Sequence, residues 1–352
     1  MFGEFSPPGN SRSVVTPANP ARHREQLPFR CTPDRPGRSS IPGDRCCREP
    51  FDAIQCAAMS QLVEHIRFAC LLEATAAKPG NVHPRASFAD MTYTDLIGSA
   101  DAVAEILATA SDRGVGRTVL DSVNATASVV DCNSNLGIIL LLAPLAAVPR
   151  DVPLATGIAT VLENLDDVDA DCVYQAIRLA RPGGLGEVVS HGVATPPRIS
   201  LMSAMNLATA HDDVAACYTD HFSRILDWSL NELPRGQQFL QNWSQSVVRL
   251  SLRILADHPD TLIARKCGMA TAVEASRRAA CLLASGWPRQ DRSPADLEAF
   301  DAWLREDGHR RNPGTTADLV TATLFAALRD GIIQSPTRRE LDNHVDRVLA
   351  AE

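Results

Sequence analysis

Lysine is nearly absent from this chain. Among its 34 basic side chains, Lys78 and Lys266 are the two lysines, and the rest are arginines. Lysine offers a compact, mobile charge, whereas arginine offers a rigid planar fork, so the two are not interchangeable where geometry matters. Two ordinary surface lysines are the simple alternative. Because arginine serves at every other cationic position, we interpret both lysine segments as candidate functional segments.

Other absences exclude whole classes of protein. A formal net charge of -8 argues against nucleic acid as a partner. The ten cysteines include no C-x-x-C pair, so we expect neither a zinc site nor a disulfide framework, and a reducing, cytoplasmic location. The longest apolar run, residues 136–148, contains Pro144 and is too short to span a bilayer, so no membrane partner is expected. No apolar segment near residue 1 has the features of a signal peptide.

Helical patterns dominate the chain after its first 50 residues. Residues 1–50 are rich in Pro, Arg, Gly and Ser and lack apolar periodicity, which predicts a disordered extension. Residues 51–352 are predicted to form a single all-α, multi-helix domain. Thr94 is expected to cap a helix that reaches Ala110. Other helices are predicted over 54–72, 115–130, from 138, 154–164, 169–180, 200–233, 237–257, 261–285, 294–305, 316–330 and 338–350.

Five polar segments interrupt or end these helices. Such segments suit phosphate, because the free backbone N–H groups of a helix N-terminus attract anions. The chain has no P-loop and no G-x-G-x-x-G unit, so a nucleotide would bind by another design. The segments are Glu73…Lys78-Pro79-Gly80-Asn81-Val82, Asn133-Ser134-Asn135-Leu136-Gly137, Pro182-Gly183-Gly184-Leu185-Gly186, Asp260-Thr261-Leu262-Ile263-Ala264-Arg265-Lys266 and Asn312-Pro313-Gly314-Thr315-Thr316-Ala317-Asp318-Leu319.

In this order, the five segments resemble those of the triphosphoribosyl-dephospho-CoA synthase family. The resemblance covers roughly Cys56 to Gly331. It implies an all-helical transferase that joins the triphosphoribosyl part of ATP to 3′-dephospho-CoA and releases adenine. ATP as substrate, Mg²⁺, and small molecules as partners follow from the same resemblance, and a homodimer is compatible with it.

The implied chemistry assigns roles to particular residues. Loss of adenine from a ribose passes through an oxocarbenium-like centre, and the attacking hydroxyl needs a carboxylate base. The candidate catalytic carboxylates are Asp318, Glu73 and Asp260, and Asp318 and Glu73 are also the candidate Mg²⁺ ligands. The candidate nucleotide-binding residues are Lys78, Gly80, Asn81, Asn133, Asn135, Gly184, Arg265, Lys266, Asn312 and Thr315. Lys78, Arg265 and Lys266 are expected to face one cleft.

Structural roles compete with these assignments. A carboxylate in the first turn of a helix, where we place Asp318, stabilises the helix dipole without any catalysis. Asp260, Asn133 and Asn135 are also good N-cap residues. The pair His211-Asp212 matches a dipeptide of metal-dependent phosphohydrolases, but supporting histidines are missing and we interpret it as chance or a cap.

Two features leave the acceptor open. The Gly-rich segment is followed by one carboxylate, Glu187, and the first segment continues as Asn81-Val82-His83-Pro84, a form associated with relatives outside lyase gene clusters. One alternative is therefore a nucleotide- or phosphoribosyl-transferring enzyme of a tetrahydromethanopterin-type C1 cofactor pathway. Another is a non-catalytic helical protein that binds a nucleotide.

Overall fold

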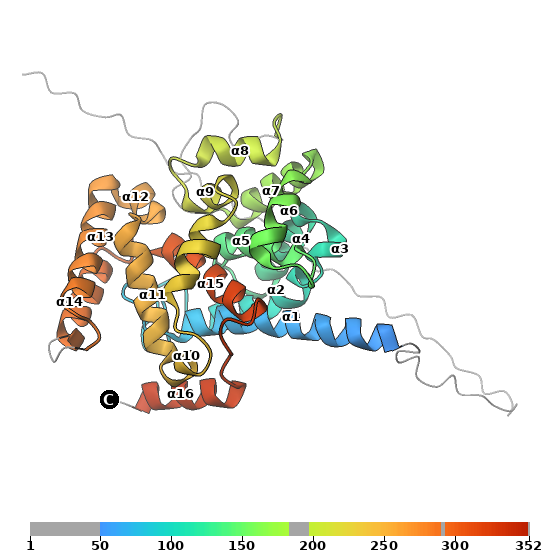
Figure 1. Ribbon diagram of the computed structural model, residues 1–352. Helices are drawn as coiled ribbons and strands as arrows, with labels where there is room; N and C mark the ends of the chain where they lie inside the picture. The colour runs from blue at the N-terminus through green and yellow to red at the C-terminus, as the bar shows by residue number, and fades with distance from the viewer. Residues whose placement is uncertain (1–49, 183–196, 290–292, 351–352) are drawn as a thin grey trace, which may run out of the picture. The chain divides into compact units, whose positions relative to one another are not determined.

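Figure 1 shows the protein as a computed structural model, which describes residues 50–182, 197–289 and 293–350. The predicted disordered extension, residues 1–50, lies outside this described part except for Pro50. Within the described part no β-strand occurs, and the backbone makes only the two isolated bridges His83–Ala86 and Gly236–Ile333. The prediction of a single all-α domain is confirmed.

The described helices follow one another along the chain. They are α1 (Pro50–Thr75), α2 (Tyr93–Leu107), α3 (Ala110–Arg113), α4 (Val115–Val129), α5 (Leu136–Ala147), α6 (Leu154–Glu163), α7 (Asp167–Ala180), α8 (Leu201–Ala208), α9 (Asp213–Thr219), η1 (Arg224–Trp228), η2 (Ser229–Glu232), α10 (Gln237–Gln241), α11 (Trp243–Asp257), α12 (Thr261–Cys267), α13 (Met269–Ala284), α14 (Ser293–Arg305), α15 (Gly314–Arg329) and α16 (Arg338–Ala350).

Two apolar helices form the centre of the core. Ten of the 12 residues of α5 are buried, and 12 of the 16 residues of α15 are buried. The two helices pack against each other, with α4 against α5 and with α1 and α11 against α15. A helix that is apolar on all sides is stable only when it is covered all round. This packing brings the polar N-termini of α5 and α15 together inside the domain.

The start of α2 differs from the prediction by two residues. Thr92, not Thr94, is the N-cap, and its hydroxyl accepts a hydrogen bond from the Asp95 backbone N–H at 3.3 Å. The Asp95 carboxylate in turn accepts from the Thr92 N–H at 2.8 Å. This reciprocal pair is a capping box, which needs an acidic or amide side chain three residues after the cap. Thr92 has one at that spacing and Thr94 does not.

The three longest helices predicted from the sequence are broken. Residues 200–233 form α8, α9, η1 and η2, residues 237–257 break at Asn242, and residues 261–285 break at Gly268. Buried apolar spacing continues across Asn242, from Phe239 to Trp243, so the sequence pattern does not reveal that break. At Gly268 the break falls in an exposed stretch instead. Gly268 has a φ of +88°, a conformation that glycine adopts without strain.

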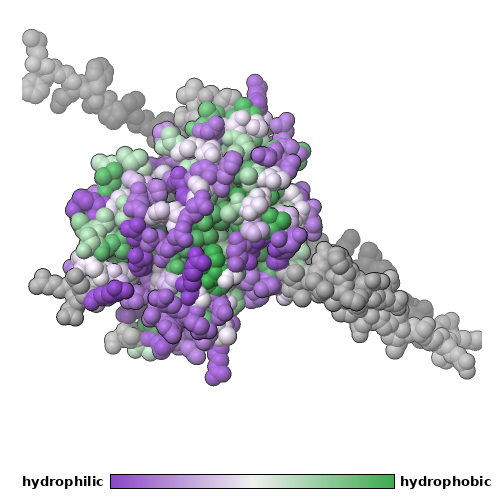
Figure 2. All heavy atoms as spheres, viewed as in Figure 1, coloured by the Kyte–Doolittle hydropathy of each residue, from purple (hydrophilic) through white to green (hydrophobic). Residues whose placement is uncertain are grey.

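None of the helices in the described part of the chain is both long and apolar enough to cross a lipid bilayer. Polar and apolar residues alternate over the face seen in Figure 2, as on most globular proteins. Cys70, Cys132, Cys172, Cys217, Cys267 and Cys281 are free thiols. Among them, Cys70 is buried, and burial raises the pKa of its thiol to about 12, so it acts as an apolar core residue.

Candidate functional site

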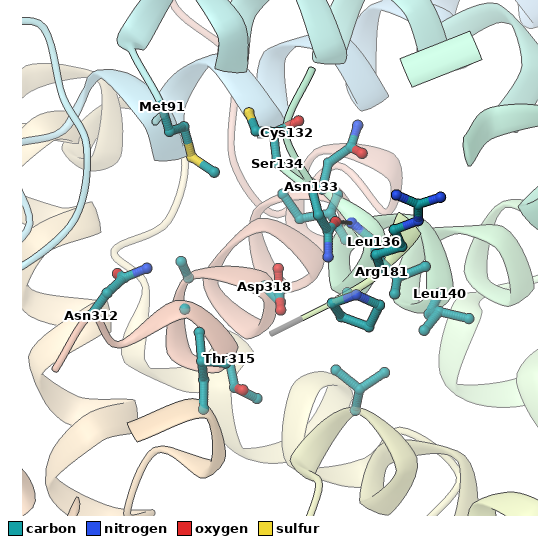
Figure 3. A pocket seen from close by; sticks show the side chains of 18 of the residues that line it. Met91, Cys132, Asn133, Ser134, Leu136, Leu140, Arg181, Asn312, Thr315 and Asp318 are labelled. Carbon is teal, nitrogen blue, oxygen red and sulfur yellow. Dashed lines mark hydrogen bonds between the residues drawn. The ribbon is translucent and has the colours of Figure 1, made fainter. Parts of the chain in front are cut away.

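A large pocket opens where the N-termini of α5 and α15 meet (Figure 3). Its volume is about 1980 Å³, whereas sites for one small molecule usually measure roughly 300–1,000 Å³. The pocket therefore has room for two substrates at once. Its described polar lining includes Glu73, Asn81, Asn133, Ser134, Asn135, Arg181, Arg265, Lys266, His309, Arg310, Asn312, Thr315 and Asp318.

Asp318 lies in the middle of this pocket, between Asn312 and Thr315 on one side and Leu136 on the other (Figure 3). It sits in the second turn of α15, whose N-cap is Pro313. The alternative that Asp318 acts as a first-turn carboxylate is therefore wrong. Among the described residues its carboxylate has no hydrogen-bond or ion-pair partner.

The environment of Asp318 disfavours its charged form. Burial raises the pKa of the Asp318 carboxyl well above its usual value, and the negative charges of Glu73, Asp260 and Asp212 add to the effect. Arg265 opposes it. An unpartnered carboxyl with a raised pKa in a cleft is typical of a functional group rather than of a structural one.

Gly137 explains how α5 can approach Asp318 so closely. A Cβ atom built on Gly137 would lie 2.0 Å from Oδ2 of Asp318 and 2.5 Å from its Cγ. No larger residue fits without displacing the carboxylate, since such contacts are far inside van der Waals distance. The glycine of the Asn-Ser-Asn-Leu-Gly segment therefore keeps the space that Asp318 occupies, a role that the sequence alone did not reveal.

Glu73 and Lys78 form a buried ion pair beside the pocket. Nζ of Lys78 lies 2.8 Å from Oε1 of Glu73, and it also donates to the backbone carbonyls of Glu73 and Ala76. Lys78 is 0% exposed and is not part of the pocket lining, although Glu73 is. The expectation that Lys78 and Lys266 would face one cleft is therefore wrong.

Lys78 instead ends α1. The last carbonyls of a helix lack partners within the helix, and the Lys78 ammonium satisfies one of them while its charge balances Glu73. A compact group with three donors suits this enclosed position, whereas a planar guanidinium is larger and needs its partners in one plane. The scarcity of lysine thus pointed to a residue whose role in this structure is to support the end of α1 and to balance Glu73.

Gly80 and Asn81 connect the end of α1 with the start of α15. Gly80 has a φ of +75°, and a Cβ there would lie 2.9 Å from Pro313, so it serves the backbone and does not line the pocket. Nδ2 of Asn81 donates to Oδ1 of Asn312 at 2.9 Å. Oδ1 of Asn81 is buried without a partner. Both asparagines line the pocket.

At the N-terminus of α5, the side-chain amide of Asn135 is a hydrogen-bond donor that no described residue uses. Oδ1 of Asn133 accepts from the Leu136 N–H at 3.2 Å, as expected for a capping side chain. Oδ1 of Asn135 accepts from the Thr126 hydroxyl at 3.1 Å, and its Nδ2 is buried without a partner. Asn135 makes no side-chain cap, so the cap alternative is wrong for Asn135, whose amide is available to a ligand.

Asp260 joins two helices and does not reach the pocket. It is 1% exposed and caps α12 by accepting from the N–H groups of Leu262 at 2.9 Å and Ile263 at 3.0 Å. Its other oxygen accepts from the Thr316 N–H at 2.7 Å and hydroxyl at 2.8 Å. All its lone-pair directions are used inside the protein, so the cap alternative is confirmed and we drop Asp260 from the catalytic set.

Three cations of the pocket come from the end of α12 and the loop before α15, and Arg181 lines the pocket from the end of α7. Arg265 and Lys266 stand in the last turn of α12, and both line the pocket with Arg310. Arg265 is held by Asp212, whose Oδ2 lies 2.9 Å from its guanidinium. Asp212 also caps α9, which confirms the capping interpretation of His211-Asp212. Lys266 forms no ion pair with any described residue.

Thr315 lies at the pocket wall next to the α12 cap. Its hydroxyl accepts from the Thr261 hydroxyl at 3.2 Å, which ties the α15 N-terminus to α12. Thr315 and Asn312 both line the pocket. Gly184 and the rest of the Gly-rich segment after Pro182 lie outside the described residues.

Sequence reasoning missed one aromatic contact at the pocket. The rings of Phe88 and His309 lie 4.2 Å apart between centroids, and both residues line the pocket. The two residues come from loops more than 200 positions apart in the chain, so no local sequence pattern predicts the contact. The φ of His309 is +64°, and burial is the main cause of the lowered pKa of its imidazole.

The described residues form an all-helical fold with a large pocket lined by cations, amides and carboxyl groups. The family model of ATP:dephospho-CoA triphosphoribosyl transferase matches residues 59–336, and the chain belongs to this family. A crystal structure of an Archaeoglobus fulgidus protein, assigned as a triphosphoribosyl-dephospho-CoA synthase, is similar with a TM-score of 0.51 and 25% identity. The match covers 68% of this chain and 99% of that one. A search of curated proteins found no match. The resemblance noted from the motifs is confirmed.

Proposed function

We propose that this chain transfers the triphosphoribosyl group of ATP to 3′-dephospho-CoA and releases adenine. The observation that carries the proposal is Asp318, an unpartnered carboxyl in the middle of a pocket of about 1980 Å³. Family membership supplies the reaction, and the pocket supplies the space in which donor and acceptor can meet. The enzyme is accordingly a transferase.

The triphosphate is expected to lie on the α12 side of the pocket. Arg265, Lys266 and Arg310 bring three cations to that side. Phosphate oxygens pair well with such groups, and Lys266 has no competing ion-pair partner among the described residues. The unused Nδ2 of Asn135 can donate to the ribose or to a phosphate oxygen.

Asp318 is proposed to receive the proton of the acceptor hydroxyl. The hydroxyl oxygen forms a bond to C1′ of the ATP ribose as the bond from C1′ to adenine breaks, and adenine leaves with the bonding electrons. The acceptor hydroxyl loses one proton to Asp318, and the leaving adenine takes up one proton, so the number of protons does not change overall. A carboxyl whose pKa is raised well above its usual value is, once ionised, a stronger base than an ordinary aspartate.

Two carboxylates of the pocket have the chemistry that Mg²⁺ prefers. Glu73 and Asp318 both line the pocket, and the charge of Glu73 helps to raise the pKa of Asp318, a repulsion that a cation between them would relieve. The described residues contain no group of three or more His, Cys, Asp or Glu that could hold a metal alone. Glu73 and Asp318 would therefore hold the ion together with phosphate oxygens. When bound, Mg²⁺ would neutralise phosphate charge.

The test is incubation of the protein with ATP, Mg²⁺ and dephospho-CoA, followed by mass spectrometry for free adenine and the coupled product. We expect both in equal amounts. Adenine released only with a pterin-pathway acceptor would identify the C1 cofactor alternative. ATP binding without adenine release in either case would identify the non-catalytic nucleotide-binding protein. Asp318→Asn serves as the inactive control.

A further inference from the structure

The lining of the pocket changes character from one end to the other. Cations and amides gather at α12 and at the start of α15, whereas α7 and α8 contribute mainly apolar side chains. These apolar residues are Val173, Ile177, Leu201, Ala204, Met205 and Leu207. We call this end the α7–α8 arm. Asp318 and the N-terminus of α5 lie between the two ends (Figure 3).

The α7–α8 arm is not explained by the triphosphate. Phosphate and ribose groups gain nothing from an apolar wall, because their polar atoms would lose hydration there without finding partners. Leu207 is 64% exposed although it lines the pocket. An exposed leucine alone is ordinary, but here it continues a buried apolar wall formed by Leu201 and Met205. Among the described residues this wall faces the pocket, so a ligand of matching character can reach it there.

The acceptor has a part of that character. Dephospho-CoA consists of an adenosine, a diphosphate and a long pantetheine arm, and its reacting hydroxyl belongs to the ribose. With that ribose near Asp318, the pantetheine arm must extend away from the triphosphate of ATP, since both ligands occupy one cleft. Arg181 lines the pocket at the end of α7 and has no ion pair with any described residue, so it can meet the diphosphate on this side.

We propose that the α7–α8 arm is the acceptor subsite and binds the pantetheine part of dephospho-CoA. This inference rests on the proposed function and adds where the acceptor lies and which part of it is recognised. It also separates dephospho-CoA from a pterin-type acceptor, which lacks a flexible amide-linked arm ending in a thiol. The volume of about 1980 Å³ allows both substrates to be bound together.

Two variants of α8 test the subsite. Leu207→Ser removes an exposed apolar contact, and Ala204→Phe fills space in the arm from a position that is only partly buried. Leu349→Ser is the matched control, because Leu349 is 49% exposed on α16 and does not line the pocket. Steady-state adenine release is measured with the full chain at varied ATP and dephospho-CoA, with and without 4′-phosphopantetheine as a competitor.

We expect 4′-phosphopantetheine to compete with dephospho-CoA and not with ATP. Leu207→Ser should raise the KM for dephospho-CoA and the inhibition constant of 4′-phosphopantetheine together, by about 5-fold, and Ala204→Phe by about 10-fold or more. Neither variant should change the KM for ATP, and Leu349→Ser should change nothing.

Several results would overturn the inference. One is that 4′-phosphopantetheine does not compete with dephospho-CoA in the unmodified protein. Another is that Leu207→Ser and Ala204→Phe change the KM values of both substrates equally, or change neither. In each of these cases adenine is still released, so the proposed function stands. A complete absence of adenine release by the unmodified protein would instead overturn the proposed function and this inference with it.

Discussion

Asp260 and Asp318 lie near the starts of two neighbouring helices, and they differ in how many hydrogen bonds they accept. Asp260 accepts four hydrogen bonds, two from α12 and two from Thr316 of α15. Asp318 lies in the second turn of α15 and lines the pocket. It accepts no hydrogen bond from the described residues. Burial raises the pKa of both carboxyls, but hydrogen bonds from Ile263 and Thr316 counteract it only at Asp260. Because Asp260 uses its oxygens inside the protein and Asp318 does not, we propose Asp318 and not Asp260 as the functional carboxylate.

The two lysines differ in the same way as the two aspartates. Lys78 is enclosed and is used fully by Glu73 and the end of α1, whereas Lys266 lines the pocket without an ion pair among the described residues. Variants of these four residues should therefore fall into two groups. One group should lose stability, and the other should lose activity.

Lys78→Met is expected to have the largest effect. It leaves the buried charge of Glu73 without a partner, a change that usually costs about 3–5 kcal/mol. Thermal or urea unfolding measures the loss. Lys78→Arg should also lose stability, because the enclosed position does not accept a guanidinium. A stable Lys78→Met protein with a raised KM for ATP would mean that Lys78 contacts the nucleotide after all.

Asp318→Asn should reduce adenine release by at least about 100-fold, the scale of a positioned base or metal ligand. It should also raise stability at neutral pH. The folded-state pKa of Asp318 is raised above that of the unfolded chain, about 3.9. Folding therefore loses stability as the pH rises from about 4 through the folded-state pKa, and the asparagine removes this loss.

Unfolding of Asp318→Asn and of the unmodified protein between pH 4 and 8 checks the sign. The advantage of the variant should grow with pH through that window, while far-UV circular dichroism shows the same fold. Full turnover combined with lowered stability would remove Asp318 from the catalytic site.

Asp260→Ala should show the reverse behaviour. It leaves the N–H of Thr316 and the first turn of α12 without acceptors, and the loss of such a buried cap costs about 2 kcal/mol. Turnover per folded molecule should stay within a few-fold of normal at low temperature. A stable variant with strongly reduced turnover would restore Asp260 to the catalytic set.

The sequence predicted the helical class, the family and most of the pocket segments, because these depend on local patterns and on motif order. It could not separate Asp260 from Asp318, since both follow helix-start signals and the number of their hydrogen-bond partners depends on the packing of α12 against α15. The role of Gly137 was equally out of reach, as its neighbour Asp318 is far away in the chain. The break at Gly268 was missed because one exposed glycine is compatible with a continuous helical pattern.

Lys266 provides the smallest and most specific test. Removing one half-buried cation from a phosphate site that retains Arg265 and Arg310 should raise the KM for ATP by about 10-fold, or about 1.4 kcal/mol. Lys266→Met should do this with unchanged unfolding, because Lys266 has no ion pair among the described residues. Lys266→Arg keeps the charge and should recover most of the affinity, whereas Lys78→Arg should not recover stability. The KM for dephospho-CoA should change by less than that for ATP, since the α7–α8 arm lies at the other end of the pocket. Equal effects on both substrates would place the triphosphate elsewhere and reverse the proposed orientation of the donor.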